Sequence, residues 1–149
     1  MIHDRPQPII LFIRTFSKKS DDFSITKIES DKVSSSKSWN LLINFEHVDS
    51  GPCQQEVQVG DKILWAYGAK NVSVFLELSG PNTASKGETQ TFTVTDGKTG
   101  KAVEGAEIVG LDTDTKGTVT IAFTSTGVHT LKATKTDTVR SNELLVLVE

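Results

Sequence analysis

The feature that most constrains the fold is a repeated alternation of apolar and polar residues in the second half of the chain. Between Thr89 and Thr95, Phe92 and Val94 alternate with threonines. Successive side chains of a strand point to opposite faces, so a period of two predicts a half-buried strand. Turn signals rich in glycine separate the segments of this kind. The expected strands are Val74–Leu78, Thr89–Thr95, Ala106–Val109, Val119–Phe123, Val128–Thr134 and Leu144–Val148, the last buried on both faces or nearly so.

Threonine content marks a boundary in the chain. Residues 1–72 contain two threonines, whereas residues 73–149 contain sixteen. Threonine is β-branched and suits the solvent face of a strand. We therefore expect two domains, a β-rich unit over 1–72 and a β-sandwich over 73–149.

The first unit also consists of expected strands. In the third of them, Trp39, Leu41, Ile43 and Phe45 share one face, and Leu42 interrupts the alternation, which indicates partial cover on the second face. No segment shows a convincing helical period, so the whole chain is predicted to be all-β. The expected strands are Ile9–Phe16, Asp22–Ile28, Trp39–Phe45, Gln55–Val59 and Lys62–Tyr67.

Charge and hydropathy exclude two classes of partner. The net charge is −3 with no basic stripe, so we expect no nucleic-acid partner. The longest apolar run, Ile9–Ile13, is shorter than the roughly 20 residues that a membrane-spanning helix needs. It is similar to the apolar region of a signal peptide, but basic residues follow it in place of a cleavage site. A buried strand is the favoured interpretation, and no membrane span is expected.

Motifs of catalysis and metal binding are absent from the sequence. No nucleophile elbow, zinc-protease motif or phosphate loop occurs, and the three histidines are scattered. The segment Asp112–Gly117 fails as an EF-hand, because Lys116 and Phe123 occupy the fifth and twelfth positions. We expect no enzyme, no cofactor and no metal. A looser calcium site at Asp96, Asp112 or Asp114 is the alternative to a solvated turn.

Three aromatic residues are the candidate ligand-binding site. Trp65 and Tyr67 lie two residues apart and share a strand face, and Trp39 belongs to a neighbouring predicted strand. Together they suit an aromatic platform on which sugar rings stack. Core packing is the competing interpretation and is favoured, because the apolar Ile63 lies on the same face.

Two further residues are candidates for covalent chemistry. Cys53 is the only cysteine, which excludes a disulfide within the chain and leaves an inert thiol or a disulfide to another molecule. Asn71 begins an Asn-x-Ser pattern, the acceptor for N-glycosylation in a secreted protein.

Two stretches resemble known families. The run Val94–Ala106, with Thr113–Gly117 and Gly127–Ala133, is similar to bacterial-type immunoglobulin-like repeats and related prealbumin-like modules. The segment Gln58–Tyr67 resembles the closing strand of the small β-grasp-like domain in the C-terminal part of transcobalamin. The resemblance implies a C-terminal immunoglobulin-like β-sandwich preceded by a small, incomplete β-grasp-like unit.

The combination of these two units is similar to a group of secreted or surface proteins of fungi and bacteria. Stretches like Asp21–Ile28, Trp39–Phe45, Cys53–Gln55 and Val139–Asn142 recur in that group, which implies an extracellular or cell-surface location. The family module starts further upstream, with an extra strand and a loop that can carry a second cysteine. Here Cys53 lacks that partner, and cobalamin-contacting residues cannot be matched.

Three functions remain open from the sequence. The first is a non-enzymatic structural or adhesion module at a cell surface or wall, with a surface protein or polysaccharide as partner. The second is a carbohydrate-binding module that uses Trp39, Trp65 and Tyr67. The third is a small-molecule, cobalamin-like binder built in the first unit. A missing upstream strand would leave an exposed edge, so we also expect a homodimer through the first unit.

Overall fold

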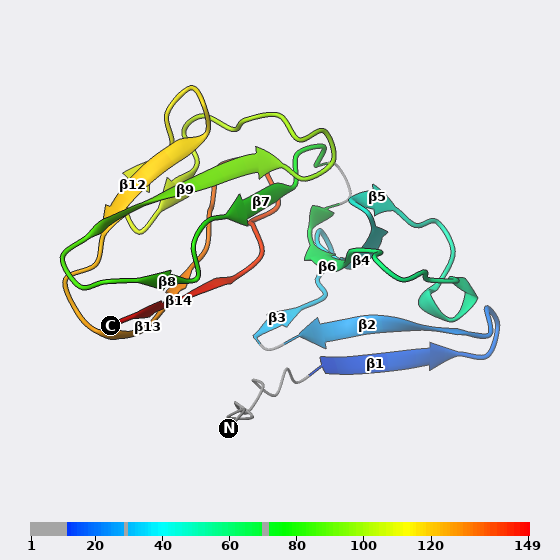
Figure 1. Cartoon of the computed structure of the whole chain (residues 1–149). Coiled ribbons are helices and arrows are strands. Elements are labelled where there is room, and N and C mark those ends of the chain that lie inside the picture. The colour runs from blue at the N-terminus through cyan, green and yellow to red at the C-terminus, as the bar shows by residue number, and fades with distance from the viewer. Residues whose placement is uncertain (1–11, 29, 70–71) are drawn as a thin grey trace. The chain divides into compact units, whose positions relative to one another are not determined.

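The computed structural model describes residues 12–28, 30–69 and 72–149, which form strands joined by turns (Figure 1). The only helix whose bounds lie wholly within these residues is a short 3-10 turn, Pro52–Gln54, so the predicted all-β fold is confirmed. No helix in this part of the chain is long and apolar enough to cross a membrane. The chain forms two compact units, which divide near residues 70 and 71, with Asn44–Glu46 belonging to the second.

The first unit contains two small antiparallel sheets. One has the strand order β1-β2-β3 and the other β5-β4-β6. β1 and β2 form a hairpin and are the longest strands of the first unit (Figure 1). β1 lies at the edge of its sheet. The strands are β1 (Phe12–Ser17), β2 (Asp22–Ile28), β3 (Asp31–Lys32), β4 (Trp39–Ile43), β5 (Glu46–His47) and β6 (Ile63–Tyr67). Of these residues, only Glu46 is assigned to the second unit.

Two strand predictions for the first unit were wrong in part. The strand from Trp39 ends at Ile43, because Asn44 and Phe45 have φ angles of 52° and 63° and form a two-residue hairpin turn. Residues 55–59 form no strand. Their apolar side chains Val57 and Val59 are 60 % and 108 % exposed, so no burial holds this segment in a sheet. Of the strand expected over residues 9–16, residues 9–11 lie outside the described part.

The second unit is a sandwich of two three-stranded sheets, β12-β9-β7 and β13-β14-β8. The short β8 runs parallel to β14, and all other pairings within these sheets are antiparallel. The hairpin of β10 and β11 is a separate two-stranded sheet, and an isolated bridge links its Glu107 to Thr134, three residues beyond the end of β13. The strands are β7 (Leu76–Ser79), β8 (Thr83–Ala84), β9 (Thr89–Asp96), β10 (Glu107–Ile108), β11 (Leu111–Asp112), β12 (Thr118–Ala122), β13 (Gly127–Leu131) and β14 (Leu144–Val148).

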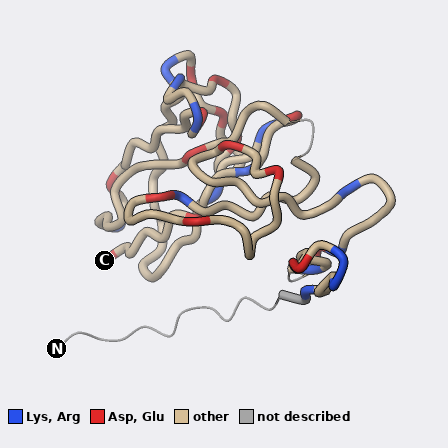
Figure 2. Tube along the Cα trace, turned by 90° about the vertical axis from the view of Figure 1, so that its right-hand side faces the viewer, with Lys and Arg blue, Asp and Glu red and all other residues tan. Residues whose placement is uncertain are grey.

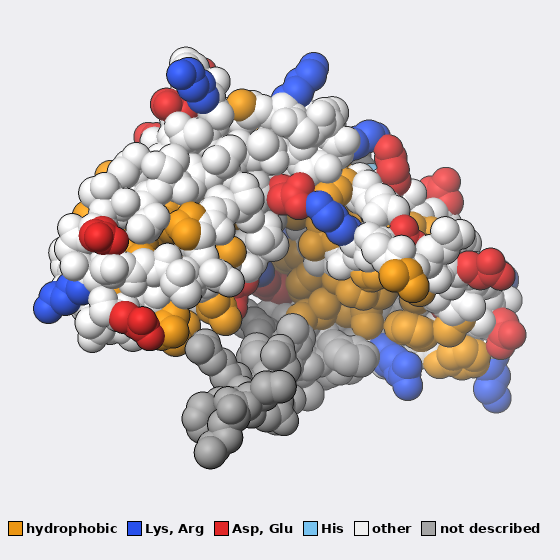
Figure 3. All heavy atoms as spheres, in the orientation of Figure 1, with side chains coloured by type: hydrophobic (Ala, Val, Ile, Leu, Met, Phe, Trp, Pro, Cys, Tyr) orange, Lys and Arg blue, Asp and Glu red, His pale blue; other side chains and the backbone are white. Residues whose placement is uncertain are grey.

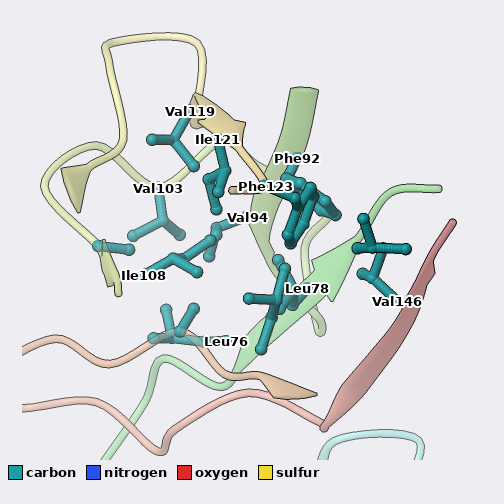
Figure 4. Close-up of a cluster of buried hydrophobic side chains, with 14 residues drawn as sticks. Leu76, Leu78, Phe92, Val94, Val103, Ile108, Val119, Ile121, Phe123 and Val146 are labelled. Atoms are coloured by element: carbon teal, nitrogen blue, oxygen red, sulfur yellow. The ribbon is translucent and has the colours of Figure 1, made fainter. Parts of the chain in front are cut away.

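The core of the sandwich is a cluster of 14 buried side chains between its sheets (Figure 4). Phe92 and Val94 of β9 are fully buried, as the alternation with threonine predicts. Phe123 packs edge-on against Phe92, with 6.1 Å between the ring centroids. The expectation that β14 is buried on both faces was wrong, because Leu145 is 46 % exposed while Val146 lies in the core.

The side chains of Ser141 and Asn142 hydrogen-bond to backbone groups of the sandwich, and Asn142 does so at the edge of β7. The Asn142 carboxamide accepts a hydrogen bond from the Leu78 N–H (2.9 Å) and donates one to the Leu78 carbonyl (3.1 Å). The Ser141 hydroxyl accepts from the Ala133 N–H at 2.8 Å. Because β7 is the last strand of its sheet, Asn142 replaces the backbone partner that this strand lacks.

Candidate functional site

The two longer strands of the β5-β4-β6 sheet place three apolar pairs on one face. Residues two apart on a strand share a face, and the register of β4 and β6 sets these pairs directly opposite each other. We call the six residues the apolar ladder. Its pairs are Trp39 with Tyr67, Leu41 with Trp65, and Ile43 with Ile63.

The apolar ladder is not the buried face of its sheet. Leu42 and Ala66, on the opposite face, are 0 % and 2 % exposed. Five members of the ladder are half-buried, and the sixth, Ile63, is 49 % exposed. Figure 3 shows hydrophobic side chains gathered on the first unit over β6 and along β2. Leu42, the residue that interrupts the alternation, is therefore the one that reaches the interior.

Trp39 and Tyr67 are held in fixed positions at one end of the ladder. Their ring centroids are 5.2 Å apart with an interplanar angle of 41°. The Trp39 indole N–H donates to the Asp31 carbonyl at 3.0 Å, and the Tyr67 hydroxyl donates to the Lys32 carbonyl at 2.6 Å. The Lys37 ammonium lies 5.8 Å from the centre of the Tyr67 ring, within the range of a cation–π contact. Both rings are anchored, and their polar groups are already engaged by β3.

Trp65 is the aromatic residue of the ladder that makes the fewest specific contacts. It is half-buried, it lies opposite Leu41, and its strand neighbour Ile63 is exposed. Within the described residues, its indole N–H donates no hydrogen bond and its ring stacks on no other aromatic ring. An unengaged indole keeps both a large apolar face and a hydrogen-bond donor for a ligand.

Cys53 lies in the 3-10 turn and is an exposed, free thiol. Desolvation, hydrogen bonding to Asp22 and the charge of that carboxylate raise the pKa of the Cys53 thiol above 9.0. The Phe23 N–H and the Arg14 guanidinium act in the opposite direction without reversing the shift. A disulfide to another molecule stays a prediction. Asn71, the candidate for glycosylation, lies outside the described residues.

Two of the three aspartates of the alternative calcium site, Asp96 and Asp114, are engaged in hydrogen bonds within their own turns. Asp114 accepts the N–H groups of Lys116 (2.9 Å) and Thr118 (2.8 Å), and the Thr118 N–H in particular lowers the pKa of Asp114. Asp96 accepts the Thr99 hydroxyl at 2.6 Å. Among the residues that the structure describes, no group of three or more His, Cys, Asp or Glu side chains is placed to hold a metal.

A polar hollow at the end of the β1–β2 hairpin is the feature that sequence reasoning missed. Its only buried lining side chain is Asp22, which is 5 % exposed and contacts residues 51 and 53. The sequence places Asp22 at a strand start but gives no signal that the segment around Cys53 folds back onto it. The hollow is lined by Ser17, Ser20, Asp22, Phe23, Ser24, Asp49, Ser50, Gly51 and Gln54.

Comparison with protein-family models, with curated proteins and with solved structures finds no match to this chain. The resemblances in the sequence therefore stay predictions. Figure 2 shows basic and acidic residues interspersed along the described part of the chain.

Proposed function

We propose that this protein is a non-enzymatic extracellular adhesion module that binds polysaccharide through the apolar ladder. In this proposal the sandwich is a rigid spacer and the first unit provides the contact surface. The observation that supports it is the partly exposed ladder, with three aromatic rings on one sheet face. The extracellular location rests on the resemblance of the sequence to secreted and surface proteins.

The ladder suits an extended ligand with apolar faces and polar edges. Same-face residues on a strand lie about 7 Å apart, so Trp65 and Tyr67 present two rings in a row. Sugar rings have apolar C–H faces that stack on aromatic rings, while Trp supplies a donor at its edge. Because Trp39 and Tyr67 are anchored by β3, binding costs little side-chain entropy at that end of the ladder.

Binding to insoluble polysaccharides tests this proposal. The purified chain and its Trp65→Ala and Trp65→Phe variants are incubated with chitin, β-glucan, cellulose and peptidoglycan, and the bound fraction is measured. We expect the wild type to bind at least one of them, Trp65→Ala to lose about tenfold or more in affinity, and Trp65→Phe to retain part of it.

A matched control distinguishes binding through the apolar ladder from non-specific adsorption by exposed hydrophobic side chains. Leu145→Ala removes a side chain of exposure similar to Ile63 from the sandwich, and it should bind like the wild type. Near-ultraviolet circular dichroism verifies that each variant is folded. Failure of the wild type to bind any of the four polymers, or unchanged binding by folded Trp65→Ala, would overturn the proposal.

A further inference from the structure

The two edges of the β12-β9-β7 sheet differ in how their backbone groups are satisfied. In an antiparallel strand, residues two apart direct their N–H and C=O groups to the same side. At the β7 edge, the Leu76 N–H donates to the Val139 carbonyl (3.0 Å), and the Asn142 carboxamide engages both groups of Leu78. Residues 139–142 therefore cover this edge.

At the opposite edge, Thr118 shows which groups of β12 point away from β9. Its N–H donates to Asp114 Oδ1 (2.8 Å), and its carbonyl accepts from the Asp114 N–H (2.9 Å). Thr120 and Ala122 direct their backbone groups to the same side as Thr118. Within the described part of the chain, no group bonds to them there. We call these N–H and C=O groups of Thr120 and Ala122 the open edge.

The open edge has none of the features that normally keep an edge strand from pairing. Proteins protect exposed edges with charged residues, above all lysine, with proline, or with very short strands. The residues of β12, Thr118–Ala122, are uncharged, and the side chains of Thr120 and Ala122 are small and exposed. By contrast, Lys132 directly follows β13, the edge of the second sheet, and β1 of the first unit contains Arg14.

We propose that the open edge pairs in antiparallel fashion with the open edge of a second copy of this chain. When the Ile121 residues of the two copies face each other on a two-fold axis, Thr120 of each copy lies opposite Ala122 of the other. Each such residue pair exchanges two N–H···O=C bonds. Every group of both open edges then has a partner, and the sheet continues from one copy into the next.

A second copy fits the open edge for reasons of charge and order. Self-pairing brings two uncharged strands together, so no like charges face each other across the contact. A second copy also presents a strand that is already formed, and pairing with it costs less ordering entropy than pairing with a disordered peptide. Asp114 occupies the groups of Thr118 and limits the contact to the open edge.

The short contact sets the expected strength. We expect it to bury less than the roughly 1,200 Å² at which stable interfaces begin, so that the dissociation constant is about 10⁻⁴ to 10⁻³ M. Copies displayed side by side on a surface would add many such contacts together. The open edge shares no residue with the apolar ladder, so self-association and polysaccharide binding can each fail without the other.

Sedimentation equilibrium of the full chain at concentrations up to about 1 mM tests the pairing. We expect the wild type to dimerise, and Thr120→Lys and Thr120→Glu each to lose about tenfold or more in affinity, because two like charges then meet close to the two-fold axis. An equimolar mixture of the two variants should recover the dimer, because opposite charges meet there instead. Thr120 is exposed, so both variants should fold, which near-ultraviolet circular dichroism verifies.

Thr130→Lys is the matched control. Thr130 is an exposed threonine of β13, the edge strand of the other sheet, and this variant should dimerise like the wild type. A wild type that stays monomeric up to about 1 mM would overturn the inference. So would wild-type association by folded Thr120→Lys, which would place the contact at another edge such as β1. Equal weakening by Thr130→Lys, or a mixture that stays as monomeric as its two components, would contradict it as well.

Discussion

The two units of this chain are both built from short strands, but they use their apolar residues differently. Among the described residues, the second unit has sixteen buried hydrophobic side chains and the first has four. In the second unit two sheets face each other across a continuous core. In the first, the apolar ladder stays partly exposed, and Leu42 and Ala66 are buried on the opposite face of that sheet.

The difference teaches that alternation identifies the two faces of a strand but not which of them is interior. In β9, the apolar residues Phe92 and Val94 are buried and the threonines between them are not. In β4, the alternating set that contains Trp39 and Leu41 is the more exposed one. The apolar surface that the ladder leaves exposed is where the proposed ligand would bind, whereas the alternating apolar residues of β9 are buried in the core of the second unit.

Truncating one large apolar side chain in each unit tests this comparison most strongly. We expect Phe92→Ala to lower the free energy of unfolding of the second unit by about 3–5 kcal/mol, because it empties a fully buried site. Trp65→Ala should cost the first unit less, about 2–3 kcal/mol, because its side chain is only partly buried. Urea unfolding monitored by circular dichroism measures both losses. Equal losses would show that the ladder is core after all.

Much of the strand pattern could be predicted from the sequence. The bounds of β2 and β14 agree with the predicted strands, and those of β9 differ by a single residue. These segments have long, regular alternation or continuous β-branched and apolar residues bounded by turns, which makes the local signal sufficient. Local signals failed at Asn44–Phe45, where backbone conformation ends β4 two residues early, and at residues 55–59, where Val57 and Val59 stay exposed.

The candidate sites could be predicted only in part. The shared face of Trp65 and Tyr67 follows from their spacing, but their pairing with Leu41 and Trp39 depends on a register between strands about 20 residues apart. The hollow around Asp22 depends on residues 49–54 folding back against β2. Contacts of this kind join segments about 30 residues apart, and a single sequence has no local feature that encodes them.

A second test concerns the edge strand β7 of the second unit, whose backbone is hydrogen-bonded by a side chain. The Asn142 side chain satisfies both backbone groups of Leu78, so Asn142→Ala leaves a donor and an acceptor at the edge of β7 without partners. We expect a loss of about 1–3 kcal/mol in the free energy of unfolding. Asn82→Ala is the control, since residue 82 contributes only its backbone carbonyl, to Leu147. An Asn142→Ala protein as stable as the control would mean that water replaces the carboxamide.

A smaller effect is expected in the pH dependence of the stability of the second unit, through Asp96. Desolvation acts to raise the pKa of Asp96, but hydrogen bonds from Thr99, Phe75 and Lys98 outweigh it and lower the pKa below 3.8. A lowered pKa in the folded state stabilises the second unit fully above the unfolded value, and this contribution is lost as the pH falls through the folded value. Asp96→Asn should therefore differ most from the wild type near neutral pH and converge with it below about pH 4. A stability difference that does not vary with pH would contradict this assignment.

The smallest expected effect lies at Cys53, in the polar part of the first unit. The thiolate is the reactive form, so a raised pKa predicts slow reaction with a disulfide reagent at pH 8 compared with a free cysteine peptide. Asp22→Asn removes the hydrogen bond and the negative charge that help to raise that pKa, leaving desolvation alone, and should speed the reaction by a factor of a few. Asp21→Asn, which changes the adjacent exposed carboxylate, should react at the wild-type rate. An Asp22→Asn rate equal to the wild type would mean that desolvation alone protects Cys53, so that its thiol is independent of the buried carboxylate beside it.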